Sequence, residues 1–231
     1  MRGISFGEKH SYRDWNLMLT SKNIGMPEVQ TQIIKIPGAD GELDFSESLT
    51  GDIKYNNRKL EFTFFVDDSY KRWYVILSQI ANYIHGKKLK IILDDDMNFY
   101  YLGRAEINKF KTNRTIGEIT ITCNVDPYKY DLTASNEDWQ WDPFDFETGI
   151  INETKDLQVD GELEVVIYGR RKKVSPIFYC DNELQCIFEG QTYNFIAGTN
   201  LVPNIQIKEG RNVFKFIGNG KVTIEYRGGS L

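Results

Sequence analysis

The chain has 231 residues, which is enough for one large domain or two ordinary domains. Its 28 basic and 33 acidic side chains give a formal net charge of −5, which argues against a protein whose work is to bind DNA. Hydrophobic residues make up 41 % of the chain and aromatic residues 13 %, which disfavours disorder and coiled coil and favours β structure.

The sequence indicates a chain that folds in a cytoplasm. The N-terminus has no apolar signal core, and no segment approaches the length of a membrane span, so we expect no membrane insertion. Three cysteines do not make a disulfide framework. Cys180 and Cys186 flank a turn and can face each other across a hairpin, but reduced core thiols are the favoured interpretation.

The first half of the chain predicts strands and a single helix. The alternation of apolar and polar residues predicts strands near 29–36, 59–66, 89–93, 98–102, 105–111 and 118–125. Residues 68–85 instead place apolar side chains at helical spacing, including Trp73 and Ile80. We expect Asp68 or Ser69 to cap this helix and its apolar stripe to pack on the sheet.

Residues 36–66 form the most distinctive stretch. It starts with a Pro-Gly turn, has glycines at positions 38, 41 and 51, and passes through an acidic, hydroxyl-rich span. It ends in a strand whose alternation marks one buried face. A long, ordered excursion with little catalytic chemistry favours contact with other chains.

The second half of the chain predicts an all-β domain. Residues 131–145 are acidic and rich in turn formers, which is typical of a linker. Turn signals then recur at close spacing, and Gly218-Asn219-Gly220 predicts a final hairpin. About seven short strands without a helix favour an antiparallel sandwich. We therefore predict a mainly β fold with two domains. The first, over 1–130, is an α+β domain that has a split-barrel-like sheet and one helix. The second, over 131–231, is an antiparallel β-sandwich.

The sequence offers no catalytic or metal-binding motif. Its two histidines, His10 and His85, lie far apart in the chain, and no phosphate-binding, zinc-protease or paired-cysteine pattern occurs. The Asp94-Asp95-Asp96 run lacks the spacing of a calcium loop and is interpreted as a hydrated strand connection. The basic run at 169–173 is interpreted as a solvated turn. We expect no enzyme activity, no metal and no cofactor.

Several short patterns, spread over nearly the whole chain, together resemble one family. They are Gly7 with Ser11-Tyr12-Arg13-Asp14-Trp15-Asn16-Leu17, Ile36-Pro37-Gly38 through Gly41, Leu43-Asp44, Tyr55-Asn56-Asn57-Arg58, the helix ahead of Gly86-Lys87, Asp126-Pro127-Tyr128, Gly210-Arg211-Asn212, and Gly218 to Tyr226-Arg227. In this order and spacing they resemble the distal tail proteins of long-tailed phages and prophages of Gram-positive bacteria.

The resemblance implies a structural virion protein at the tail tip, assembled in the cytoplasm of the bacterial host. In that family the N-terminal domain forms a hexameric ring at the end of the tail tube, and a galectin-like β-sandwich projects from it. The ring joins the tail tube protein to the tail-associated hub or lysin of the baseplate, and DNA passes through its lumen. No sequence-specific nucleic-acid binding is implied.

The resemblance also places a ring-forming loop in the first domain, over residues 38–58. The subunit-interface residues predicted within it are Gly38, Asp40, Gly41, Asp44, Phe45 and Arg58. Arg58 is expected to pair with an acidic neighbour, Asp40, Glu42 or Asp44, in the same or the next subunit.

Two other classes of function compete with a ring protein. A carbohydrate-binding module for host cell-wall glycan is suggested by the sandwich and by Trp139 and Trp141. The His-Asn-Arg-Trp pattern that galectins use for galactosides is absent, so the galectin likeness concerns the fold. A cell-wall hydrolase lacks a nucleophile or metal signature.

Overall fold

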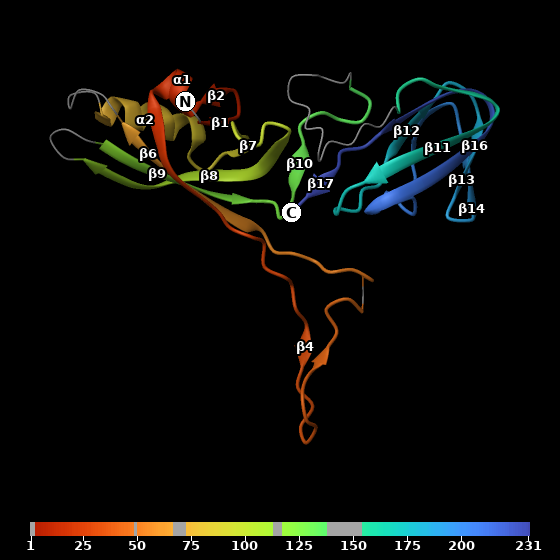
Figure 1. Ribbon diagram of the computed structural model, residues 1–231, viewed down its shortest axis with the longest axis horizontal. Helices are drawn as coiled ribbons and strands as arrows, with labels where there is room; N and C mark the ends of the chain where they lie inside the picture. Colours follow the sequence, from red (N-terminus) through yellow and green to blue (C-terminus); the bar gives the residue numbers. More distant parts are fainter. Residues whose placement is uncertain (1–2, 49, 67–72, 113–116, 138–153) are drawn as a thin grey trace. The chain divides into compact units, whose positions relative to one another are not determined.

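A computed structural model describes residues 3–48, 50–66, 73–112, 117–137 and 154–231. The chain divides into two compact units, both built mainly from antiparallel strands (Figure 1). The first unit comprises residues 1–96, 100–129 and 231, and the second comprises residues 97–99 and 130–230.

The first unit contains an antiparallel sheet curled into a half-barrel, with the strand order β2-β1-β7-β8-β9-β6-β3. Its strands are β1 (Ile4–Phe6), β2 (Lys9–His10), β3 (Leu17–Ile24), β6 (Arg58–Val66), β7 (Lys88–Leu93), β8 (Phe99–Thr112) and β9 (Gly117–Val125). The two strands predicted at 98–102 and 105–111 are one strand, β8, with an irregularity between Ile107 and Lys109. A bulge of this kind lets a long strand bend without ending.

Two helices lie in the described residues of the first unit, where the sequence predicted one. The predicted helix is α2 (Trp73–Ile84), and its proposed caps at Asp68 and Ser69 lie outside the described residues. The second helix, α1 (Ser11–Trp15), is only five residues long. Its N-cap is His10, whose Nδ1 accepts hydrogen bonds from the backbone N–H groups of Tyr12 at 3.2 Å and Arg13 at 3.1 Å. None of the helices in the described part of the chain has the length and apolar content needed to cross a membrane.

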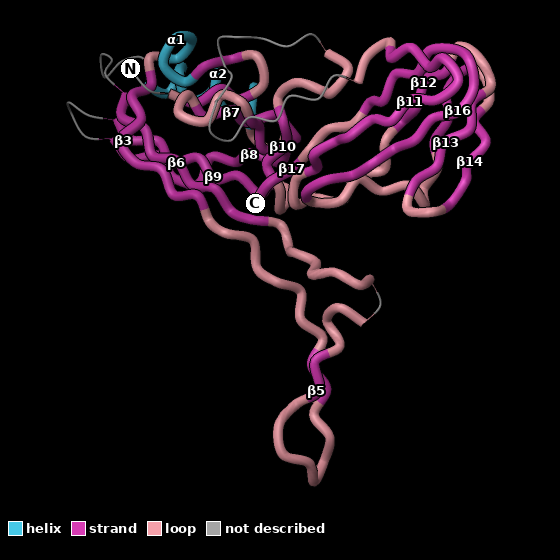
Figure 2. Tube along the Cα trace, turned by 45° about the vertical axis from the view of Figure 1, so that its right-hand side comes forward, coloured by secondary structure: helices cyan, strands magenta, loops and turns pink. Residues whose placement is uncertain are grey.

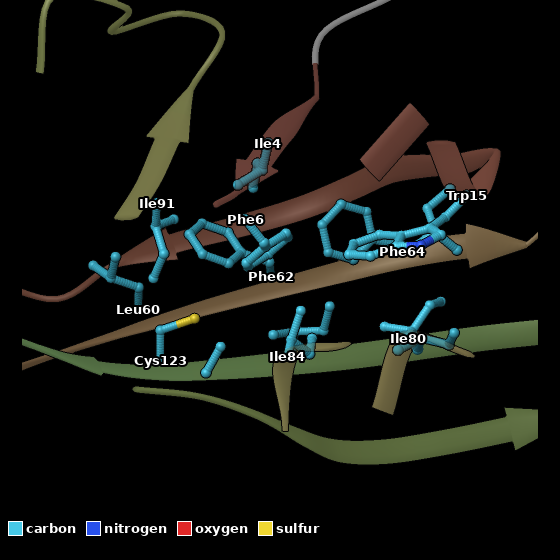
Figure 3. Close-up of a cluster of buried hydrophobic side chains, with 14 of the residues drawn as sticks. Ile4, Phe6, Trp15, Leu60, Phe62, Phe64, Ile80, Ile84, Ile91 and Cys123 are labelled. Atoms are coloured by element: carbon cyan, nitrogen blue, oxygen red, sulfur yellow. The ribbon is translucent and has the colours of Figure 1, made fainter. Parts of the chain in front are cut away.

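The core of the first unit lies between the sheet and α2. Figure 3 shows side chains from the strands and from α2 pointing toward one another. The ring of Phe6 lies 6.1 Å from that of Phe62 and 6.3 Å from that of Phe64, in edge-to-face arrangements. Ile80 and Ile84 of α2 are fully buried against them. The alternation predicted for β6 is confirmed, because its alternate apolar side chains are buried.

The three consecutive aspartates are not merely hydrated, and this corrects the prediction. The Asp94 carboxylate lies 3.1 Å from His10 Nε2, Asp95 pairs with Lys22, and the Asp96 carboxylate lies 2.8 Å from Lys129 Nζ. One strand connection therefore ties the N-terminal segment, β3 and the segment after β9 together within the first unit. The sequence gives no sign of these ion pairs, because the partners lie far from the three aspartates along the chain.

The described residues of the second unit form strands and no helix, as predicted. Its strands are β10 (Lys129–Asp131), β11 (Leu157–Gly169), β12 (Ile177–Cys180), β13 (Leu184–Phe188), β14 (Gln191–Phe195), β15 (Gly198–Leu201), β16 (Gly210–Glu225) and β17 (Gly229–Ser230). The main strand order is β14-β13-β16-β12-β15, β11 also pairs with β16, and β10 pairs with β17. Its core contains a group of Phe side chains, with the rings of Phe188 and Phe214 stacked 4.6 Å apart.

The predicted final hairpin is wrong, because β16 runs without a turn through Gly218 and Gly220. These glycines serve close approach. A Cβ at Gly218 would lie 2.8 Å from Leu184 Cδ2, and one at Gly220 would lie 2.5 Å from Asp181 Oδ1. Glycine at these two positions therefore lets the backbone of β16 lie close to neighbouring residues. Because glycine is also common in turns, the sequence pattern was interpreted as a hairpin.

All three cysteines are buried and free. Cys180 lies on β12 and Cys186 on β13, and each of these strands pairs with β16 rather than with the other. Burial raises the pKa of Cys123 and of Cys186 to about 12, and that of Cys180 to about 11. Thiols in such an environment stay protonated and unreactive at neutral pH.

Candidate functional site

Between β3 and β6 the chain leaves the sheet of the first unit as an extended arm, which we define as residues 25–57 (Figures 1 and 2). Backbone hydrogen bonds join the two sides of the arm. At its base the N–H of Gly25 donates to Lys59 O at 3.0 Å, and farther out the N–H of Phe45 donates to Gln32 O at 2.8 Å. Near its tip the short strands β4 (Ile33–Ile34) and β5 (Leu43–Asp44) pair antiparallel. The arm is therefore a two-stranded ribbon and not an irregular loop.

One face of the ribbon is apolar. Ile34 lies opposite Leu43 in the register, and Ile36 and Phe45 follow on the same face at a spacing of two residues. We call these four side chains the apolar face of the arm. Their exposed fractions are 54 % for Ile34, 47 % for Leu43, 46 % for Ile36 and 41 % for Phe45. Single exposed apolar residues are ordinary on a protein surface, but a contiguous row of them on a projecting ribbon is not.

The other face of the ribbon carries polar and acidic side chains beside one exposed apolar residue, Ile33. Lys35 Nζ lies 3.0 Å from Glu42 Oε1, and Asp44 Oδ1 accepts a hydrogen bond from the backbone N–H of Ser46 at 2.8 Å. Hydrogen bonds from the hydroxyl and the backbone of Ser46 lower the pKa of Asp44 below its usual value, so its carboxylate is charged at neutral pH. The two faces of the arm therefore offer different chemistry to a partner.

The tip of the arm depends on two of the predicted glycines. Gly38 has φ of 84° and Gly41 has φ of 82°, a region of backbone conformation that side-chain-bearing residues rarely adopt. The turn lies between β4 and β5, so these glycines let the ribbon reverse direction. Asp40 lies between them, also exposed. The structure thus brings Gly38, Asp40, Gly41, Asp44 and Phe45 together on the outer part of the arm.

Arg58 is not part of that group, and the expected pairing with Asp40, Glu42 or Asp44 of the same chain is wrong. Its side chain is 3 % exposed at the start of β6. Nη2 donates to Tyr101 Oη at 3.1 Å and Nη1 donates to Pro127 O at 3.2 Å. The guanidinium also lies 4.8 Å from the centroid of the Tyr101 ring.

These contacts give Arg58 a positioning role at the base of the arm. Because it joins β6 to β8 and to the segment after β9, it fixes the point from which the arm departs. The rings of Tyr55 and Tyr128 pack edge-to-face at 5.9 Å in the same region. Burial raises the pKa of Tyr101, so its hydroxyl stays protonated beside the guanidinium.

Sequence reasoning missed most of the apolar face. Of its four members only Phe45 was among the predicted residues, and Ile34, Ile36 and Leu43 were not. The signal was present, because apolar residues alternate on both sides of the Pro-Gly turn. The glycines and charges of the loop drew the interpretation away from this alternation.

The described part of the chain offers no constellation suited to catalysis. It contains no group of three or more His, Cys, Asp or Glu side chains that could hold a metal ion. An open hollow is lined by residues of β1 and β3 and by Asp95, but the lysine and the carboxylate that line it, Lys22 and Asp95, pair with each other. Trp139 and Trp141, on which the carbohydrate hypothesis depends, lie outside the described residues.

The fold described here, mainly antiparallel β with a curled half-barrel, is similar to that of a phage distal tail protein. The chain is similar over 98 % of its length to the crystal structure of the SPP1 Dit (gp 19.1) protein, of which 99 % is covered, with a TM-score of 0.63 and 13 % sequence identity. That protein is described as a paradigm of hub adsorption apparatus in phages that infect Gram-positive bacteria. The resemblance seen in the sequence is thereby confirmed for the fold. No protein-family model and no curated protein matches the chain.

Proposed function

We propose that this chain is a structural protein of a phage or prophage tail that forms a ring at the distal end of the tail tube. In this proposal the first unit builds a hexameric ring and the second is a galectin-like sandwich. The ring connects the tail tube protein to the tail-tip hub or lysin, and its lumen passes DNA. The protein is not an enzyme and works at the tip of the virion tail.

The observation that carries this proposal is the apolar face of the arm. Apolar surface buried at a contact contributes about 25 cal/mol per Å², so a row of four large side chains favours association. A ribbon on one side of a subunit that binds a different surface on the next makes a head-to-tail contact, which closes into a ring when the rotation allows. The near full-length likeness to the SPP1 protein supports a tail role.

Replacing two members of the apolar face tests the ring. We expect Leu43→Asp with Phe45→Asp to abolish the oligomer while the chain stays folded, because charged side chains resist burial in an apolar contact. Leu43→Asp alone is compared with Ile33→Asp, a control with the same charge change, since Ile33 is 49 % exposed on the same ribbon but lies on its other face. Light scattering measures the mass, and electron microscopy of negatively stained particles shows the ring. A wild-type chain that stays monomeric, alone and with tail tube and hub proteins, would contradict the proposal.

The carbohydrate-binding module remains the alternative. Direct binding of the full chain to host cell-wall glycan, lost when Trp139 or Trp141 is replaced by Ala, is the result that would favour it. A ring that forms without such binding favours the tail protein.

A further inference from the structure

The imidazole of His10 is held by hydrogen bonds at both of its ring nitrogens. His10 ends β2 and is 5 % exposed. Its Nδ1 accepts from the backbone N–H groups of Tyr12 at 3.2 Å and Arg13 at 3.1 Å, and its Nε2 lies 3.2 and 3.1 Å from the two carboxylate oxygens of Asp94. Gly3 packs against the ring so closely that a Cβ there would lie 2.4 Å from His10 Cε1. These contacts hold the ring in one orientation.

The same contacts define which proton the ring carries. A ring nitrogen that accepts two N–H groups has no hydrogen of its own, so Nδ1 is unprotonated. The neutral imidazole then carries its hydrogen on Nε2 and donates it to the Asp94 carboxylate. An imidazolium carries a hydrogen on both nitrogens and accepts at neither. The arrangement around α1 therefore requires the neutral form of His10.

The other histidine of the chain, His85, makes a weaker version of this arrangement. Its Nδ1 accepts a hydrogen bond from the backbone N–H of Ile107 at 3.1 Å, but the side chain is exposed. Water can replace a lost bond at an exposed N–H, whereas a buried group left without a partner costs about 1–3 kcal/mol. Protonation at Nδ1 therefore has the larger consequence at His10.

The charged groups around His10 favour an imidazolium once Nδ1 is free. Asp94 faces the ring from the connection after β7, and Asp14 of α1 accepts the backbone N–H of His10 at 2.7 Å. The two cations nearest in the sequence are Arg13, which is exposed, and Lys9, whose amino group lies over an aromatic ring. β1 contributes no charged side chain. A protonated ring therefore keeps its partner at Asp94 and loses only the two N–H groups at Nδ1.

We propose that His10 is a pH-sensitive lock on α1. At neutral pH the neutral ring accepts the N–H groups of Tyr12 and Arg13. As the pH falls through the range in which an imidazole takes up its second proton, around pH 6.5, Nδ1 becomes a donor and releases them. The released form binds one more proton than the locked form, so the locked form loses stability as the pH falls. This inference goes beyond the proposed function and applies to a monomer and to a ring alike.

Release of α1 loosens one corner of the first unit. The helix joins β2 to β3, and β3 leads into the arm. Its last residue, Trp15, is 7 % exposed, and its ring lies 5.7 Å from that of Tyr83 on α2 and 6.3 Å from that of Phe6 on β1. A helix of five residues has few bonds of its own, so its position depends on this packing and on His10.

Hydrogen exchange read by mass spectrometry tests the lock in the full chain. After correction for the intrinsic pH dependence of exchange, we expect the protection of residues 11–16 to fall by up to about tenfold per pH unit between about pH 6.5 and 5.5, because one proton is linked to release. His10→Asn is the matched variant, since the Asn side chain accepts at the same place and does not titrate. Its corrected protection should not change over this range.

His85→Asn removes the other imidazole and should keep the wild-type profile at residues 11–16. The peptide that covers β6 is the internal reference, and circular dichroism checks that each variant is folded. The inference is overturned if the wild-type protection is flat, if β6 loses protection in parallel, if folded His10→Asn shows the same fall, or if His85→Asn abolishes it. Should His10→Asn not fold, the wild-type and His85→Asn profiles still decide the question.

Discussion

The arm and the second unit use the same alternation of apolar and polar residues with opposite results. In β16 the alternate side chains Phe214 and Phe216 are fully buried in the core of their own unit. On the arm, Ile34, Leu43 and their neighbours repeat every second residue but stay about half exposed. Alternation therefore reports that a strand has one apolar face, and it does not report whether the strand's own unit covers that face.

The largest expected effect on stability comes from a substitution in β16 of the second unit. Phe214→Ala removes a fully buried ring stacked on Phe188, and we expect it to lower the free energy of unfolding of that unit by about 3–5 kcal/mol. Phe45→Ala on the arm is the matched control, since an exposed ring costs less than about 0.5 kcal/mol when removed from a monomer. Denaturant unfolding at low protein concentration measures both. Equal losses would show that the arm is part of a core.

Arg58→Met tests the junction between the arm and the sheet, where an arm-adjacent residue is buried in the core of the first unit. The variant keeps the aliphatic stem but loses the hydrogen bonds to Tyr101 and Pro127, and we expect the first unit to lose about 2–3 kcal/mol. Lys59→Met, at the exposed neighbouring position of β6, should change stability little. Unfolding of the full chain, followed by the fluorescence of Trp15 and Trp73, measures the loss. A stable variant that only fails to oligomerise would return Arg58 to the interface.

The smallest effect concerns the cap of α1. His10→Ala removes the acceptor for Tyr12 and Arg13 and the contact with Asp94, and we expect a loss of about 1 kcal/mol in the first unit. His10→Asn keeps a side-chain acceptor for the cap and should recover part of that loss. Thermal unfolding of the two variants beside the wild type checks the order. If both variants equal the wild type, the cap contributes nothing to stability.

The sequence predicts those parts of the fold whose signal is local. The strand alternation of β6 and the helical spacing of Trp73 and Ile80 each occur within one element, and the structure has both elements. The short helix α1 was missed because a five-residue helix shows little periodicity and because a histidine is an uncommon cap. The final hairpin was mispredicted because glycine signals both turns and close approach.

The site shows the same division. The glycines of the arm marked an excursion that reverses direction, and Gly38 and Gly41 do form its tip. Arg58 was assigned to the interface because it lies within residues 38–58, where the family resemblance places a ring-forming loop. Its side chain turns inward instead, as the first residue of β6, and only the fold brings it to Tyr101. The partners of Asp94, Asp95 and Asp96 are likewise distant in sequence, so no local pattern announces them.

β16 gives the second unit a particular kind of cooperativity. The strand pairs with β11 along the whole of that strand, with β13 over part of its length and with β12 near its end. Removing β16 would take a pairing partner from all three strands at once, whereas the edge strands β14 and β15 each pair with a single neighbour among the described strands. We therefore expect hydrogen exchange to reach β14 and β15 first, through local opening, while the amides of β16 exchange only when the whole unit unfolds.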